Sequence, residues 1–382
     1  MVVEKGFKHT NFGEVPIEWE VRKLGKIAVI KDGTHQTPKY FESGIPFYSV
    51  ENVTSNDFNN TKFISELEHN FLTRHFRIEK GDVLMTRIGS IGDCKYVDWN
   101  PNASFYVSLA LLKFDNPHIA KYFYHFSQSN IFKKEIELNS LQHAVPKKIN
   151  LGNISIVRIL LPNTEIEQTA IANALSDMDA LIAQTENLIA KKKAIKQGVM
   201  QELLKPKEGW VTKKLGEVCE IKKGQLITDS TRVNGDIPVI AGGKTPAYYH
   251  NKSNRSGKTI TISGSGASAG YVSFHDYPIF ASDCSTISNS SKYNVEFIFY
   301  WLQLNQSLIF SLQTGGAQPH IHPSDLNPLD ISLPIIEDQD QIAIIFRDLQ
   351  SDINILETKL NKLKHQKQGM MQALLTGKIR LI

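Results

Sequence analysis

Two stretches of the chain carry apolar residues at the spacing of a long helix. In the later stretch the apolar positions alternate between steps of four and three residues, as in the seam of a coiled coil; they are Ile342, Phe346, Leu349, Ile353, Leu356, Leu360 and Leu363. The earlier stretch keeps this register at Ile171, Leu175, Met178, Ile182 and Ile189. Thr185 and Lys192 interrupt it, so this helix is expected to need its partner for stability. We predict two long helices that pack as an antiparallel coiled coil.

Each long helix follows a Leu-Pro pair, and the first has signals at both ends. Thr164–Glu167 spells a capping box, and Pro206 is expected to stop the helix. At 1.5 Å per residue, about forty helical residues make a rod of roughly 60 Å, which we interpret as a spacer of fixed length. Lysines cluster toward the helix ends and are expected on a solvated face; they are Lys191, Lys192, Lys193, Lys196, Lys359, Lys362, Lys364 and Lys367.

Outside these helices the hydrophobic period shortens. Residues 82–86 and 258–263 are short, rich in β-branched residues and bounded by glycine, which predicts strands. Helices are expected from Asn116 to Phe132 and from Val295 to Leu312. The predicted fold class is α+β, with two tandem mixed α/β domains separated by the two long helices.

The sequence of the first half reappears in the second. Trp19–Gly25 returns as Trp210–Gly216, and the same offset carries Gly33 onto Gly224. A repeat this long, present only twice, predicts two domains of similar shape related by a pseudo-two-fold axis. We expect a first domain at 1–160, a central helix at 161–205, a second domain at 206–332 and a C-terminal helix at 333–382.

Composition and charge leave several function classes open and remove others. With 382 residues, 41% of them hydrophobic, the chain is long enough for two or three cores, and its net charge of +4 permits a polyanionic partner. Cys94, Cys219 and Cys284 lie too far apart for a zinc knuckle and are expected to be reduced, buried thiols. The charged N-terminus and the absence of a long apolar run predict a cytoplasmic protein without a membrane segment.

Several sequence motifs of catalytic or ligand-binding sites are present only in part. Gly242–Thr245 resembles the end of a phosphate-binding loop, but Pro238 stands where a glycine is required. The elbow-like Gly266–Gly270 precedes an expected strand instead of a helix, and the pair His320 and His322 has no third metal ligand nearby. No Asn-Pro-Pro-aromatic motif is present, so the chain is not expected to methylate bases itself. A serine hydrolase using Ser268 and a pure coiled-coil scaffold stay open as alternatives.

Four motifs, taken in order, resemble those of the DNA-specificity (S) subunit of type I restriction-modification systems. They are Lys31–Pro38, Gly81–Gly92, Gly315–Ile321, and a Leu-Pro pair followed by Glu-Gln and a long helix. The resemblance implies a non-catalytic chain with two target-recognition domains, each reading one half of a split target in double-stranded DNA. It also implies two docked modification subunits and separate restriction/translocase subunits. S-adenosylmethionine, ATP and Mg would belong to those partners, with no cofactor or metal in this chain.

Loop residues with hydrogen-bonding reach are the predicted DNA contacts. In the first domain they are Lys31, Thr34, His35, Gln36, Lys39, Arg87 and Ser90. In the second domain they are Lys223, Gln225, Lys244, Tyr248, Ser263, Ser265, Ser268, Gln318 and His320. Arg87 follows an expected strand beside a glycine loop, where it can bind guanine, clamp a phosphate or form a surface salt bridge. Tyr248 can equally belong to the core.

Overall fold

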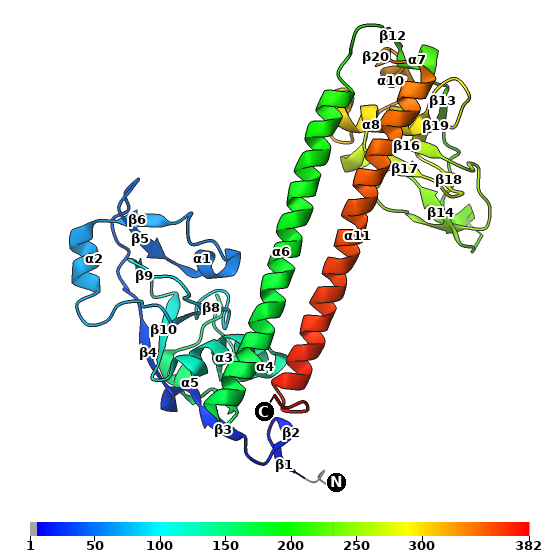
Figure 1. Ribbon diagram of the computed structural model, residues 1–382. Coiled ribbons are helices and arrows are strands. Elements are labelled where there is room, and N and C mark those ends of the chain that lie inside the picture. The colour runs from blue at the N-terminus through cyan, green and yellow to red at the C-terminus, as the bar shows by residue number, and fades with distance from the viewer. Residues whose placement is uncertain (1–5, 232, 382) are drawn as a thin grey trace. The chain divides into compact units, whose positions relative to one another are not determined.

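The computed structural model describes residues 6–231 and 233–381 (Figure 1). The chain divides into two compact units: unit 1 comprises Met1–Gln184 and Leu360–Ile382, and unit 2 comprises Thr185–Lys359. The division crosses both long helices, α6 (Glu165–Leu203) and α11 (Ile336–Leu374). Unit 1 therefore contains the first mixed α/β domain, the N-terminal part of α6 and the C-terminal part of α11. Unit 2 contains the second domain, the C-terminal part of α6 and the N-terminal part of α11.

Unit 1 is built on an antiparallel sheet with the strand order β4-β10-β7-β8. A smaller sheet, β6-β5-β9, joins β5 to β9 in parallel, and β11-β3 and β1-β2 form separate pairs. The strands are β1 (Phe7–Thr10), β2 (Gly13–Pro16), β3 (Glu20–Lys23), β4 (Ala28–Asp32), β5 (Ile45–Tyr48), β6 (Lys62–Ile64), β7 (Val83–Thr86), β8 (Cys94–Tyr96), β9 (Ser104–Phe105), β10 (Leu109–Phe114) and β11 (Arg158–Leu161).

The helices of the first domain pack mainly on this sheet, with α3 against β8 and β10 and α5 against β4. They are η1 (Leu24–Lys26), α1 (Val50–Ser55), α2 (Glu66–Leu72), α3 (Pro117–Ser127), α4 (Asn130–Asn139) and α5 (Leu151–Ile156). The single helix predicted over 116–132 is wrong. The chain leaves the helix after Ser127, and the Ser129 hydroxyl accepts a hydrogen bond from the Phe132 amide at 3.2 Å, which caps a new helix.

Unit 2 repeats the same plan. Its main sheet has the order β13-β19-β16-β17, a smaller sheet β15-β14-β18 joins β14 to β18 in parallel, and β12 pairs with β20. The strands are β12 (Val211–Lys214), β13 (Ile221–Lys223), β14 (Ile237–Ile240), β15 (Tyr248–His250), β16 (Thr259–Ser263), β17 (Val272–His275), β18 (Phe280–Ala281), β19 (Cys284–Ser288) and β20 (Asp330–Leu333).

The second domain also breaks a predicted helix in two. Its helices are α7 (Leu215–Val218), η2 (Asp229–Thr231), η3 (Gly266–Ser268), α8 (Val295–Leu304), α9 (Gln306–Ser311) and α10 (Pro323–Leu326). The expected helix over 295–312 is interrupted at Asn305, whose side-chain amide donates to the Trp301 carbonyl at 2.8 Å. An asparagine that bonds to the backbone in this way competes with continuation of the helix.

The two main sheets have corresponding strands in the same order, which confirms the predicted fold class of two similar mixed α/β domains. Gly33 and Gly224 occupy equivalent places after β4 and β13. A Cβ atom on either glycine would lie 2.0 Å from a carbonyl oxygen, that of Phe105 or of Ser282. Both positions need glycine because another segment of backbone passes against them.

The predicted seam residues of α6 and α11 face the interior of their units. Ile171, Leu175, Ile189, Phe346, Ile353 and Leu363 are buried, and Met178, Ile182, Ile342, Leu349, Leu356 and Leu360 are half-buried. In unit 1, Leu175 shares a core with Leu374. In unit 2, Phe346 shares a core with Met200. The start of each helix thus packs near the end of the other, as antiparallel pairing requires.

Polar groups accompany this seam, and Lys196 and Lys367 depart from the prediction that the lysines lie on a solvated face. The other predicted lysines stay nearer the solvent: Lys191, Lys193, Lys359, Lys362 and Lys364 are exposed, and Lys192 is half-buried. In unit 2, Lys196 is only 9% exposed and its Nζ donates to Gln350 Oε1 at 2.6 Å. In unit 1, Lys367 Nζ lies 2.6 Å from Asp179 Oδ1 and donates to Gln128 Oε1 at 2.7 Å. The two lysines head the repeated segments Lys196–Leu204 and Lys367–Leu375, so the duplication preserves one buried contact in each unit.

The ends of α6 agree with their sequence signals in part. The Thr164 hydroxyl accepts a hydrogen bond from the Glu167 amide at 3.3 Å, as the capping box predicts, and the helix ends three residues before Pro206. The Glu167 carboxylate does not complete the box. It is buried, it accepts from Trp19 Nε1 at 3.1 Å, and it pairs with Arg380.

Candidate nucleic-acid interface

In the first domain, two predicted site loops are joined by one carboxylate. Asp32 is the last residue of β4, and Arg87 follows β7 directly. Asp32 Oδ2 accepts from Arg87 Nη1 at 3.0 Å and lies 2.8 Å from His35 Nε2. Asp32 is not among the residues predicted from the sequence, although its position beside Lys31 in the same motif was a usable signal.

The structure gives Arg87 a supporting role. Its side chain is 5% exposed, and besides Asp32 it donates to the carbonyl of Ile149 at 3.3 Å and to that of Val107 at 3.4 Å. The guanidinium is therefore buried while the Asp32 side chain stays 28% exposed, and the guanidinium has too little exposed area to bind a base or a phosphate. Arg87 fixes the loops that follow β4 and β7.

The remaining first-domain residues lie nearer the solvent. Lys31, His35, Gln36, Lys39 and Ser90 are exposed, and Thr34 is half-buried. The Thr34 backbone accepts from the Val107 amide at 3.0 Å and its amide donates to the Phe105 carbonyl at 3.2 Å, so the loop after β4 is held on both sides. The Ser90 hydroxyl donates to the Asp93 carboxylate.

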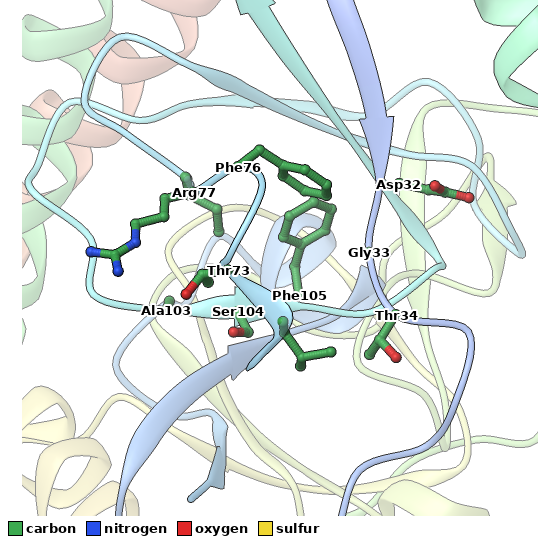
Figure 2. A pocket seen from close by; sticks show the side chains of 11 residues that line it. Asp32, Gly33, Thr34, Thr73, Phe76, Arg77, Ala103, Ser104 and Phe105 are labelled. Carbon is green, nitrogen blue, oxygen red and sulfur yellow. The ribbon is translucent and has the colours of Figure 1, made fainter. Parts of the chain in front are cut away.

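A cavity of about 230 Å³ opens beside this loop (Figure 2). Asp32, Gly33 and Thr34 line one side of it, and Thr73 and Arg77 come from the segment after α2. Figure 2 shows the rings of Phe76 and Phe105 between these two sides; the ring centroids are 6.1 Å apart. The loop with the predicted DNA contacts and the segment after α2 therefore belong to one surface.

In the second domain, a cavity of about 410 Å³ gathers four of the predicted residues. They are Lys223, Ser265, Gln318 and His320. Ser265 and His320 face each other across a β-bridge, and the Ser265 hydroxyl donates to the Asp283 carboxylate. Asp283 and His322 line the same cavity and were not selected from the sequence. The rings of His320 and His322 are stacked with centroids 6.2 Å apart.

The other predicted residues of this domain differ in how far they are buried and hydrogen-bonded within it. Ser263 is 3% exposed and donates to the Gly242 carbonyl at 2.8 Å, so its selection as a DNA contact is corrected to a structural role. Tyr248 is half-buried and its hydroxyl donates to the Ile227 carbonyl at 2.5 Å. Gln225 and Lys244 are exposed and Ser268 is half-buried, with Lys244 Nζ 5.2 Å from the centre of the Tyr271 ring.

The two domains place different chemistry on equivalent backbone. Asp32 pairs with Ala110 between β4 and β10, and Lys223 pairs with Ser285 at the matching place between β13 and β19. In the first domain the backbone amide of Arg87 donates to the Ser108 carbonyl. In the second domain the backbone amide of Gly264 donates to the Asp283 carbonyl at the equivalent place. An acid is thus replaced by a base at one position, and a serine by an acid at another.

The three cysteine thiols and the loop at Ser268 show no sign of an activated nucleophile. Burial raises the pKa of each of the thiols Cys94, Cys219 and Cys284 to about 12, so all three stay protonated at neutral pH. After Ser268 the chain enters strand β17, as predicted, and not the helix of a nucleophile elbow.

Two kinds of feature are absent from the part of the chain that the structure describes. Within residues 6–231 and 233–381, no three His, Cys, Asp or Glu side chains come together in a way that would hold a metal ion. In the same ranges, none of the helices combines the length and the apolar character needed to cross a membrane.

Comparisons with known proteins agree with the duplicated fold. Residues 16–196 and 207–365 match the family described as type I restriction modification DNA specificity domain. The putative type I restriction enzyme MjaX specificity subunit of Methanocaldococcus jannaschii is 27% identical over 421 residues, covering 99% of this chain and 97% of that protein. A putative type I specificity subunit of Mycoplasma pneumoniae is 32% identical over 145 residues, covering 37% of this chain and 38% of that protein.

A solved structure shares the fold. The S subunit of the type I restriction-modification system from M. genitalium has a TM-score of 0.68 at 17% identity, covering 96% of this chain and 97% of that chain. Because the family match extends over both halves, the chain belongs to the type I restriction-modification DNA specificity family, as a non-catalytic DNA-recognition subunit.

Proposed function

We propose that this subunit recognises a DNA target in two parts, with one half-site read by each domain and the spacing between them set by α6 and α11. The observation that carries the proposal is the repeated sheet with different side chains at equivalent positions. A shared backbone frame suits presentation of two similar surfaces to a duplex, and the different side chains on this frame suit different bases.

The residues proposed to contact DNA are those that remain accessible. In the first domain they are Lys31, Thr34, His35, Gln36, Lys39 and Ser90. In the second domain they are Lys223, Gln225, Lys244, Ser265, Ser268, Gln318 and His320. Tyr248 is included as well, although it is half-buried and its hydroxyl donates to the Ile227 carbonyl. Lysine supplies positive charge toward phosphates, histidine supplies ring nitrogens for hydrogen bonds, and glutamine supplies the paired donor and acceptor that match adenine.

We further propose that the catalytic steps belong to partner subunits. Two modification subunits docked on this chain would bring S-adenosylmethionine, and restriction/translocase subunits would bring ATP and Mg. The protonated thiols and the elbow-like loop that leads into a strand support this division, because they give the chain no activated nucleophile at these positions.

The experiment is a selection of bound duplexes from a random library by this chain purified with its modification subunits. The expected result is two short constant segments separated by a fixed number of unconstrained base pairs. Gln36→Ala should relax preference in one segment only and Gln318→Ala in the other, each by about 1–3 kcal/mol for the affected base pair. Gln366→Ala, at an exposed position of α11, is the matched control. A single continuous motif, or relaxation of both segments by either variant, would contradict the proposal.

A further inference from the structure

The first domain contains an insert that the second lacks. Between β6 and β7, residues 65–82 include helix α2, whereas residues 251–258, which join the corresponding strands β15 and β16 and are all described, contain no helix. Figure 1 shows α2 on the side of unit 1 that carries β5 and β6. Ser65 caps the start of α2 by accepting from the Glu68 amide at 3.2 Å. The insert is therefore an ordered part of the domain.

Two arginines and a histidine lie just beyond the end of α2, in residues 74–77, which we call the arginine segment. Arg74, His75 and Arg77 are all exposed. The guanidinium of Arg74 lies 4.8 Å from the centre of the Phe71 ring, and Phe71 is itself 61% exposed. Stacking on a ring orients a guanidinium without using its N–H donors, so these donors remain available to a ligand.

The two arginines of this segment differ from the others in the chain. Within residues 6–231 and 233–381, neither Arg74 nor Arg77 has a hydrogen bond or an ion pair, although each side chain carries five donors. Every other arginine in these ranges donates to an acceptor of this chain; these arginines are Arg22, Arg87, Arg158, Arg255, Arg347 and Arg380. Free donors on two guanidinium groups of one short segment favour an external anionic partner.

The position of the segment indicates which anion. Arg77 lines the same cavity as Asp32, Gly33 and Thr34, and the packing of Phe76 against Phe105 holds the segment next to the loop after β4 (Figure 2). A duplex that contacts this loop therefore presents phosphates close to the arginine segment. The acidic residues of α2, Glu66 and Glu68, lie in its first turn, at the opposite end of the helix.

We propose that the arginine segment binds backbone phosphates of duplex DNA beside the half-site read by the first domain. This inference rests on the proposed function, because it assumes that the loop after β4 faces DNA. Phosphate contacts add affinity and fix the position of the domain on the duplex, but they carry no base preference. The contribution is one-sided, since the second domain has no corresponding helix in residues 251–258.

The test uses this chain in complex with its modification subunits, a duplex that carries the selected target and a scrambled duplex of the same length. For the double variant Arg74→Gln/Arg77→Gln, the slope of log K against log salt concentration should become shallower by roughly 1.8, the value for two lost phosphate contacts. Preference for the target over the scrambled duplex should stay as in the unaltered protein. The charge-conserving variant Arg74→Lys/Arg77→Lys should keep most of the slope.

A matched control removes two cations from the same domain outside the cavity. Arg22→Gln/Lys26→Gln changes exposed residues of β3 and η1 and should leave the slope unaltered. An unchanged slope in the arginine-segment variant overturns the inference, as does loss of the modification subunits from the complex, which would identify a protein partner instead. If the unaltered complex shows no preference for any duplex, the proposed function itself fails, and that result is distinct from an unchanged slope.

Discussion

Arg87 and Gln36 both lie in loops that follow strands of the first domain's main sheet. The Arg87 side chain is buried and hydrogen-bonded within the domain, whereas Gln36 is exposed. Residue spacing identified both loops, because glycine and polar residues after a β-branched run predict them. Spacing did not show that Arg87 donates hydrogen bonds to Asp32 and Val107, because these partners lie far from it in the sequence. Exposure is set by tertiary contacts, and the DNA contacts expected of the exposed loop residues stay predictions.

At the residue scale, we expect Arg87→Met to destabilise the first domain rather than alter base preference. The change leaves the Asp32 carboxylate and the Val107 and Ile149 carbonyls without their donor. Removing the buried donor of this partly exposed ion pair should cost about 2 kcal/mol of the free energy of unfolding, measured by urea titration. Arg22→Met, which removes an exposed pair with Glu20, should cost less than about 1 kcal/mol. Equal losses for the two variants would refute the supporting role of Arg87.

His125 predicts a dependence of stability on pH. Burial, followed by the nearby Lys367 and Lys121, lowers the pKa of His125 from 6.5 to about 3. Below pH 6.5 the unfolded chain binds a proton that the folded chain does not, so this contribution to stability is present above pH 6.5 and is lost as the pH falls toward 3. The loss should be about 1.4 kcal/mol per pH unit well below 6.5.

The measurement compares urea titrations at pH 7 and pH 5. The unaltered protein should lose about 2 kcal/mol more between these pH values than His125→Gln does. His143→Gln, at an exposed position, should behave like the unaltered protein. If His125→Gln shows the same loss as the unaltered protein, His125 does not hold this proton linkage.

At the scale of elements, the long helices were predicted well and the short ones less well. A seam repeated over many turns is a strong signal, and the structure has α6 and α11 where the seam requires them. The two breaks that the sequence did not predict each depend on one side chain, Ser129 or Asn305, bonded to the backbone. Such caps are local events that the hydrophobic period does not record.

The paired lysines yield a prediction about the two ends of the helix pair. Lys367 faces the Asp179 carboxylate, whereas Lys196 is bonded only to the amide oxygens of Gln303 and Gln350, and burial lowers the pKa of Lys196. We expect Lys367→Met to cost about 1.5 kcal/mol, because it leaves a carboxylate without its donor. Lys196→Met should change stability by less than about 0.5 kcal/mol or increase it, because a buried cation is replaced by an apolar chain. Urea titration measures both, and a larger loss for Lys196→Met would contradict this account.

At the scale of the whole molecule, the repeated sequence predicted the repeated topology before any contact was known. Trp19 and Trp210 mark the two copies, and Gly33 and Gly224 occupy equivalent places against a neighbouring backbone. The fold was predictable because duplication preserves the positions that backbone geometry demands. The half-sites were not predictable, because the copies carry different side chains at equivalent positions, such as Asp32 and Lys223, beside the loops proposed to contact DNA.

The spacer role of the helices gives a prediction about target geometry. The division between the units crosses α6 after Gln184 and α11 after Lys359. Four residues inserted within 183–194, matched by four within 352–363, lengthen the helical segment by about 6 Å. The number of base pairs between the half-sites should increase while both half-sites stay the same. An unchanged spacing would show that the helices do not set it.

The central claim is that this chain directs modification to a two-part target, and a genome-wide map of methylated bases in the native host tests it most directly. The map is compared between cells with the gene intact and cells with the gene deleted. We predict a split methylated motif that disappears on deletion and returns when the gene is restored. A methylation pattern unchanged by deletion, in cells that produce the chain and its modification subunits, would contradict the account.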